Sequence, residues 1–132
     1  MFQDNGSSYI FTENIPFQYI ASTYVGTVGQ LGLVIGKVNI AGVTNPTPAR
    51  FFNPTGCVVD SSNTIYIADT FNNCIRTIDS SDNVVIYAGA QNSSGIILAG
   101  YTNGIRLSAS FNQPNGLAVD STGNLYIADK GN

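Results

Sequence analysis

The sequence predicts an all-β fold built from repeated antiparallel sheets, and three observations support this prediction. The chain contains an internal repeat with a period of 60 residues, and such periods are typical of solenoids, propellers and arrays. Short segments rich in β-branched and aromatic residues alternate with turn residues, which indicates strands joined by tight turns. These segments are apolar at consecutive positions, so both faces of each sheet are expected to be covered.

The repeat aligns residues 51–72 with residues 111–132 without a gap. Of the 22 aligned positions, 11 are identical. The identical pairs include Pro54 and Pro114, Gly56 and Gly116, Asp60 and Asp120, Tyr66 and Tyr126, and Asp69 and Asp129. This agreement indicates two copies of one structural unit.

One repeat is expected to hold four strands, at residues 56–60, 64–69, 74–79 and 84–89. Because short runs of turn residues separate them, the strands should form an antiparallel meander. No segment has a sustained helical period of apolar residues, and no helix is expected. A four-stranded sheet stacked between copies of itself is a propeller blade, so we predict a β-propeller segment. A sandwich or a barrel would leave one face of each strand more polar.

The predicted blades divide the chain into three parts. Residues 1–50 are expected to form the outer strands of a degenerate blade, at 14–22 and 24–29, followed by a Gly-rich connector. Residues 51–110 form one complete repeat, and residues 111–132 form the first two strands of the next. The ring is therefore expected to be incomplete in this chain.

Residues 51–89 and 111–132 resemble NHL repeats. The shared pattern is Pro-x-Gly, an apolar strand ending in Asp, a turn, Tyr-Ile-Ala-Asp, and then Asn before an Ile-Arg strand. One departure is Asn73, which stands where the family often has His. The resemblance implies a propeller of about six blades, so we expect this chain to be part of a longer protein. The alternative is that several copies assemble into one ring.

Four aspartates follow the repeated strands. Asp60 and Asp120 end the first strand of each repeat, and Asp69 and Asp129 end the second. A carboxylate in this position can accept backbone N–H groups of the following turn, and we expect these structural roles. The alternative is a ring of carboxylates around the propeller axis that holds a hard cation such as calcium. We expect no metal and no other cofactor.

The sequence offers little for catalysis. It contains no His, and Glu13 is its only Glu. A Ser-His-Asp triad, a Cys-His pair and His-rich zinc sites are therefore excluded within this chain, and we expect no catalytic residue and no enzymatic activity. The alternative is a segment of a propeller enzyme, of the lyase or lactonase type, whose axial metal is held by blades absent from this sequence.

Cys57 and Cys74 stand on the first and third predicted strands of one blade. Two strand spacings separate their backbones by about 9.6 Å, whereas a disulfide needs Cα atoms within about 7 Å. We therefore expect two free, buried thiols, with a disulfide as the less favoured alternative.

The long connector at residues 90–110 is the candidate binding segment, because loops at blade junctions project from the scaffold. Within it, Tyr101, Thr102, Asn103 and Gly104 are the candidate partner-binding residues. We expect a scaffold or interaction module that binds a protein, further blades or a glycan; the alternative is that the loop only covers the blade edge.

Charge and composition exclude other partners. The net charge is −3, and the five basic residues are scattered, so the chain lacks the clustered Lys and Arg of nucleic-acid-binding proteins. The most apolar stretch, residues 31–43, contains Lys37 and is too short to cross a bilayer. Asn5 and Asn92 lie in N-glycosylation sequons, which favours an extracellular or cell-surface location.

Overall fold

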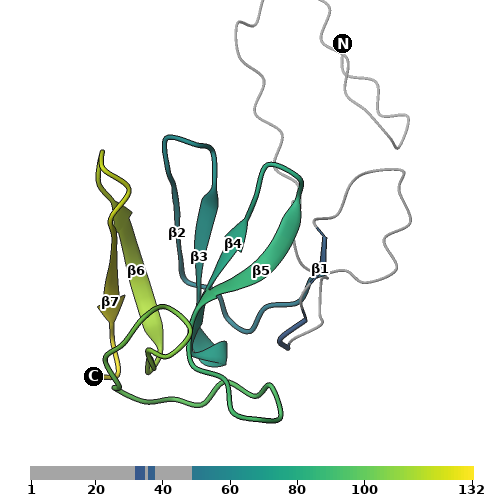
Figure 1. The fold of residues 1–132 in the computed structure, drawn as a ribbon, viewed down its shortest axis with the longest axis vertical. Helices are drawn as coiled ribbons and strands as arrows, with labels where there is room; N and C mark the ends of the chain where they lie inside the picture. The colour runs from purple at the N-terminus through teal and green to yellow at the C-terminus, as the bar shows by residue number, and fades with distance from the viewer. Residues whose placement is uncertain (1–31, 35, 38–48) are drawn as a thin grey trace, which may run out of the picture.

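A computed structural model describes residues 32–34, 36–37 and 49–132 of the chain (Figure 1). The strands predicted at 14–22 and 24–29, together with Asn5 and Glu13, lie outside these residues. The described residues form antiparallel sheets, and none of their helical segments is long and apolar enough to cross a membrane.

The first repeat folds into the predicted four-stranded blade. Its strands are β2 (Gly56–Val59), β3 (Ile65–Asp69), β4 (Cys74–Ile78) and β5 (Asn83–Ala88). Consecutive strands pair in antiparallel fashion. Two features were not predicted: a single 3-10 turn, η1 (Thr70–Asn72), between β3 and β4, and a two-residue strand, β1 (Gly36–Lys37), which pairs with β5 and makes the sheet five-stranded.

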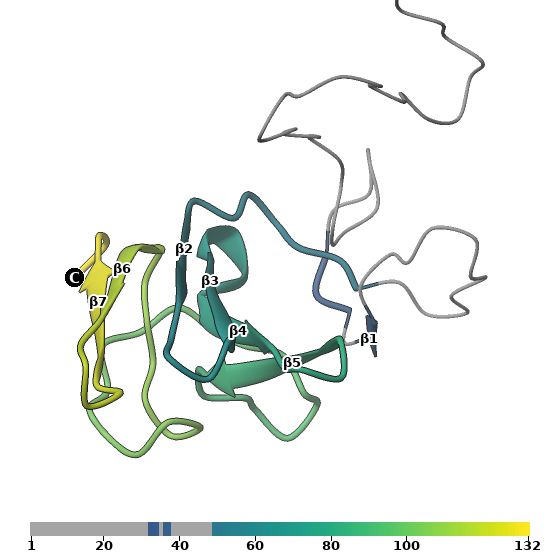
Figure 2. The same ribbon diagram turned by 90° about the horizontal axis from the view of Figure 1, so that it is seen from above.

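The second repeat forms the hairpin of β6 (Pro114–Val119) and β7 (Leu125–Asp129). Its register copies that of the first repeat, since Gly116 lies opposite Ala128 as Gly56 lies opposite Ala68. The two views in Figures 1 and 2 place this hairpin beside β2, on one face of the first blade.

The three hairpins share one turn. Asp60, Asp79 and Asp120 each accept, on one carboxylate oxygen, the backbone N–H groups two and four residues further on, at 2.8–3.0 Å. The residue three positions after each aspartate has a positive φ; these residues are Asn63, Asp82 and Gly123. Asn, Asp and Gly tolerate this left-handed conformation best, which explains why turn-type residues recur here.

Both faces of the blade are apolar, as predicted. One face buries Tyr66, Ala68, Ile75 and Ala88 against side chains of the second hairpin, among them Leu117 and Ile127. The other face buries a cluster formed by Ala49, Phe51, Ile67, Ile78 and Val84. In the repeat alignment Leu117 is the counterpart of Cys57. The face of the second hairpin that contacts the first blade therefore corresponds to the face of the first blade that points away from the second hairpin.

Contact between the two blades depends on Gly56. A Cβ atom at this position would collide with the backbone carbonyl oxygen of Asn115 in β6. The Thr70 hydroxyl donates to the Pro114 carbonyl oxygen at 2.8 Å and adds a polar contact across the same junction. The glycine of the repeated Pro-x-Gly pattern is thus explained by the close approach of the next blade.

Candidate functional site

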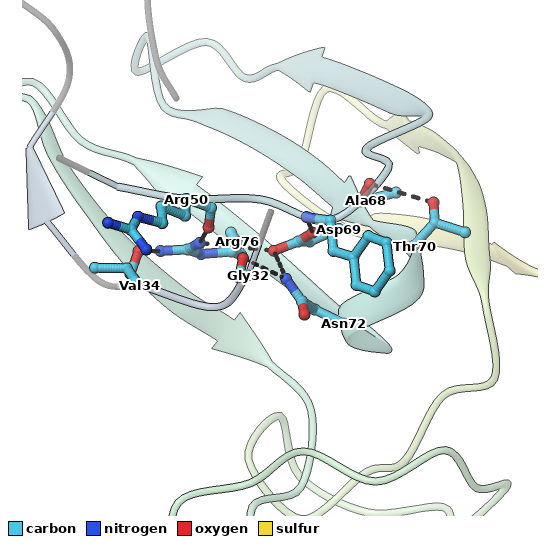
Figure 3. Close-up of polar contacts among 9 residues, drawn as sticks. Gly32, Val34, Arg50, Ala68, Asp69, Thr70, Asn72 and Arg76 are labelled. Carbon is cyan, nitrogen blue, oxygen red and sulfur yellow. Dashed lines mark hydrogen bonds and ion pairs between the residues drawn. The ribbon is translucent and has the colours of Figure 1, made fainter. Parts of the chain in front are cut away.

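Asp69 organises the loop end of the first blade (Figure 3). It is fully buried at the end of β3. One carboxylate oxygen accepts the backbone N–H of Phe52 at 2.8 Å, and the other accepts the side-chain amide of Asn72, also at 2.8 Å. The same amide nitrogen of Asn72 donates to the Gly32 carbonyl oxygen at 2.9 Å. Asp69 therefore binds the chain before β2 as well as the loop that follows β3.

Arg76, in β4, is also fully buried. Its guanidinium donates to the carbonyl oxygens of Arg50 and Val34, at 2.6 and 2.7 Å. It lies 3.6 Å from the Asp69 carboxylate and 4.6 Å from the centroid of the Phe51 ring. Burial lowers the pKa of Arg76 and raises that of Asp69, and the ion pair offsets part of the cost of burying both charges.

This guanidinium site was missed by the sequence analysis. The available signal was a charged residue in the middle of the otherwise apolar strand Cys74–Ile78, because a buried charge requires partners. Its partners Val34 and Arg50 lie 42 and 26 residues away and could not be read from local sequence.

The second repeat reproduces the aspartate network. Asp129 accepts the backbone N–H of Asn112 at 2.8 Å and the side-chain amide of Asn132 at 2.5 Å. The Asn132 amide also donates to the Gly100 carbonyl oxygen at 2.7 Å. Asp69 and Asp129 thus hold upstream backbone in place, a partner that the sequence analysis did not anticipate.

Asp60 and Asp120 are committed to the hairpin turns. A hydrogen bond from the Thr64 backbone is the main cause that lowers the pKa of Asp60, and the side-chain amide of Asn124 is the main cause for Asp120, whose pKa falls well below the usual range. The hydroxyls of Tyr66 and Tyr126 donate to the remaining oxygens, at 3.2 and 3.1 Å. Among the described residues, no three His, Cys, Asp or Glu side chains gather where they could hold a metal ion.

The connector between β5 and β6 carries an exposed apolar surface. It runs below the ends of the strands in Figure 1. Its large exposed side chains, which we call the apolar connector surface, are Ile96, Leu98, Tyr101, Ile105 and Leu107. Tyr101 and Ile105 are 84% and 82% exposed. Thr102, Asn103 and Gly104, the other predicted binding residues, are exposed as well.

The connector is nevertheless held in a defined conformation. The N–H groups of Gly89 and Ala90 donate to the carbonyl oxygens of Arg106 and Ala109, at 2.9 and 2.7 Å. Ile97 is buried, and the Arg106 guanidinium lies 4.5 Å from the centroid of the Tyr87 ring. An ordered loop loses less conformational entropy on binding than a mobile one.

A hollow of about 310 Å³ adjoins the connector at the blade junction. It is lined by Phe52, Phe71, Asn73, Ala99, Asn112 and Gln113. The two phenylalanine rings meet edge to face, with centroids 5.1 Å apart. None of the described residues that line the hollow is ionisable, so they offer aromatic rings and neutral amides. Asn73, the departure from the family pattern, is one of these amides.

The two cysteines differ in their surroundings. Both are free. Cys74 is buried, and burial raises the pKa of its thiol to about 12. Cys57 is exposed, so the expectation of two buried thiols is wrong for this residue. The reason is that Cys57 lies on the face of the blade that points away from the second hairpin, and no described segment covers it there.

Asn92 is exposed and forms a turn of its own. Its side-chain oxygen accepts the backbone N–H groups of Ser94 and Ile96, at 2.9 and 3.0 Å. Its glycosylation stays a prediction.

The repeated sheets, packed face to face, define a segment of a β-propeller. The family model of the NHL repeat matches residues 111–132. Human NHL repeat-containing protein 2 is 30% identical over 100 residues, which cover 74% of this chain and 12% of that protein. NHL repeat-containing protein 3 from Mus musculus is 28% identical over 120 residues, which cover 89% of this chain and 30% of that protein. The chain belongs to the NHL repeat family. It spans less than a third of the length of these relatives.

Solved structures with the same fold come from Bacteroides. A Bacteroides thetaiotaomicron protein whose name proposes a phosphatase matches 82% of this chain and 24% of its own, with a TM-score of 0.66 and 25% identity. An auxiliary nutrient binding protein from the same organism matches 81% of this chain and 25% of its own, with a TM-score of 0.60 and 26% identity.

Proposed function

We propose that this chain is part of a non-catalytic NHL β-propeller that binds a protein partner through the apolar connector surface. The observation that carries the proposal is the concentration of five large, exposed apolar side chains on one ordered connector. Exposed apolar side chains gathered on one segment are costly in water and are typical of interaction sites. Tyr101 is the expected anchor, since tyrosine is enriched among the residues that dominate binding energy.

The state of the carboxylates supports a non-catalytic role. Asp60, Asp69, Asp120 and Asp129 each accept at least two hydrogen bonds from the protein itself. A general acid or base needs a group that is free to exchange a proton with a substrate. The exposed surface of the connector therefore offers binding rather than proton transfer.

The partner surface is expected to be apolar, and the location extracellular or at the cell surface. The sequons at Asn5 and Asn92 support this location. A mobility shift of the secreted protein on treatment with an N-glycosidase, reduced in Asn92→Gln and lost in the double variant Asn5→Gln with Asn92→Gln, would support it.

The interaction is tested by site-specific photo-crosslinking in the intact protein. A photoreactive amino acid at position 101 is expected to give a saturable crosslink to one partner, and a second Ile105→Ser substitution should abolish it. The matched control places the same amino acid at Ser93, an exposed polar position of the same connector. Equal labelling from both positions would contradict the proposal.

A glycan is the second candidate ligand, and the hollow beside the connector favours it. Its phenylalanine rings and neutral amides match the apolar faces and hydroxyl groups of a sugar ring. Phe71→Ala should abolish glycan binding and leave the protein partner bound.

The alternative is a propeller enzyme whose metal is held by further blades. A tightly held stoichiometric metal ion in the intact protein would favour this enzymatic role over the binding role that we propose.

A further inference from the structure

We propose that the hollow at the blade junction is a receptor for one neutral pyranose ring, with Phe71 as its stacking platform. The side-chain amides of Asn73, Asn112 and Gln113 are its hydroxyl partners. The proposal rests on the glycan ligand suggested above and adds the chemical class of that ligand and the role of each residue. It does not depend on the apolar connector surface.

The two repeats build the same backbone at this place with different side chains. The Phe71 N–H donates to the Phe52 carbonyl oxygen at 3.0 Å, and in the second repeat the Gly131 N–H donates to the Asn112 carbonyl oxygen at 2.7 Å. In the repeat alignment Gly131 is the counterpart of Phe71, and Asn112 is the counterpart of Phe52. The loop thus forms without either aromatic ring, so the blade does not require the phenylalanine pair.

The side chains also occupy the two loops differently. In the second repeat the Asn112 amide donates to the Gly131 carbonyl oxygen at 2.8 Å, and a Cβ atom at Gly131 would collide with the Asn112 side chain. In the first repeat Phe71 meets Phe52 edge to face and stays 46% exposed. Because aromatic side chains dominate the energetics of interfaces, an exposed ring that the fold does not require is a candidate ligand contact.

The amides beside these rings have hydrogen-bonding capacity to spare. The Asn73 Oδ1 accepts the backbone N–H of Gln113 at 3.0 Å and so joins the two blades next to the hollow. Within the part of the chain that the structure describes, the Asn73 Nδ2, the Asn112 Oδ1 and the side-chain amide of Gln113 make no hydrogen bond. Since an amide side chain carries both donor and acceptor groups, the described lining offers both kinds next to aromatic rings.

A pyranose with mainly equatorial hydroxyls matches this combination. Its axial C–H groups form a flat apolar face that can lie on the Phe71 ring, and its hydroxyls, each a donor and an acceptor, project from the rim toward the amides. None of the described lining residues is charged, so an anionic sugar gains no ion pair here. The volume of about 310 Å³ is small for a ligand site, which favours a single ring.

A proline-rich peptide is the competing occupant, because aromatic-lined grooves also bind such peptides. Proline has no backbone N–H, so a proline-rich segment presents mainly acceptors and would leave the Asn112 Oδ1 without a donor. The mixture of free donors and acceptors in the hollow therefore favours the sugar.

The test is a titration of the intact protein with methyl β-glucopyranoside, followed by saturation-transfer NMR on the ligand. Glucitol, the open-chain polyol derived from glucose, is the control ligand, because it has the hydroxyls but no flat apolar face. We expect saturable transfer to the glycoside, strongest at its axial C–H protons, and none to glucitol.

Variants assign the binding to the hollow. Phe71→Ala should weaken it by about tenfold, whereas Phe71→Tyr, which keeps the ring, should retain it. Gln113→Gly removes only the side-chain amide, and glycine tolerates the φ of 56° at this position. This variant should bind about threefold more weakly with no loss in melting temperature. Tyr101→Ala is the matched control, since Tyr101 is exposed on the connector but does not line the hollow, and it should bind the glycoside unchanged.

Several outcomes would overturn the proposal. These are absence of glycoside binding, equal binding of the glycoside and glucitol, glycoside binding that Phe71→Ala leaves intact, and binding of a proline-rich peptide in place of the glycoside. Binding of an anionic glycan alone, lost in Phe71→Ala, would overturn the neutral pyranose but keep the glycan ligand of the proposed function. Failure of the protein-binding role has a different signature, which is equal photo-labelling from positions 101 and 93.

Discussion

Tyr66 and Tyr126 make the same hydrogen bond in successive repeats, yet one is buried and the other is exposed. Their hydroxyls donate to Asp60 and Asp120 at 3.2 and 3.1 Å. Tyr66 is 9% exposed because the β6–β7 hairpin covers its face, whereas Tyr126 is 59% exposed. Local structure is thus determined within a repeat, and burial is determined by the neighbouring blade.

This distinction predicts that equivalent glycines differ in their tolerance to substitution. Gly56→Ala should lower the free energy of unfolding by about 1–3 kcal/mol, because the added methyl group meets the Asn115 carbonyl of the next blade. Gly116→Ala is the matched control, since its Cβ would meet only the Ala128 side chain, at 3.6 Å; its effect should stay within about 0.5 kcal/mol. Chemical denaturation of both variants checks this, and equal losses would refute it.

Arg76 should contribute far more to stability than Arg106, which also contacts an aromatic ring. Arg76→Met leaves the Asp69 carboxylate and the Val34 and Arg50 carbonyls without their partner. Loss of one member of a buried pair costs about 3–5 kcal/mol. Arg106→Met is the control, because Arg106 is exposed and its contact with Tyr87 contributes about 1 kcal/mol or less.

The pairing itself is tested by the double variant Asp69→Asn with Arg76→Met. Removing both charges leaves no unpaired ion in the site, so the double variant should be less destabilised than the sum of the two single variants. If the losses in free energy of unfolding measured in urea titrations were strictly additive, the two side chains would not act together.

Much of this fold could be predicted from local sequence, and the reason is that each hairpin closes on itself. Asp60 and Asp120 bond to residues two and four positions away, so the turn is encoded within five residues. The strands follow for the same reason, since they pair with their immediate neighbours in the chain.

The Arg76 site and the exposure of Cys57 were missed because both depend on distant segments. The Arg76 site needs Val34, and the exposure of Cys57 depends on which face of the blade is covered. Neither can be inferred from the residues around Arg76 or Cys57, because their surroundings arise only when segments separated by tens of residues meet.

The hairpin aspartates predict an acid-dependent loss of stability. The pKa values of Asp60 and Asp120 are lowered in the fold by hydrogen bonds to the charged carboxylates, so folding favours ionisation. Their contribution is fully present above the unfolded pKa of about 4 and is lost as the pH falls below it. Asp69 acts in the opposite sense, because burial raises its pKa.

Urea midpoints measured between pH 6 and pH 3 check this dependence. The double variant Asp60→Asn and Asp120→Asn retains a side-chain oxygen to accept the turn N–H groups but cannot titrate. Its midpoint should change less on acidification than that of the original chain. If the urea midpoint changed equally with pH in the two proteins, these aspartates would be ruled out as the source of the acid-dependent loss of stability.

The two thiols should react at very different rates. Cys57 is exposed, whereas Cys74 is buried and burial raises its thiol pKa to about 12. Because the thiolate is the reactive form, a thiol reagent at pH 8 should modify one cysteine per chain rapidly and the second only after unfolding. Cys57→Ser should abolish the rapid phase. Two unreactive cysteines that become reactive on reduction would instead reveal a disulfide. A longer form of the protein in which another blade covers this face should protect Cys57 without changing Cys74, so the rate at Cys57 reports directly whether that face is occupied.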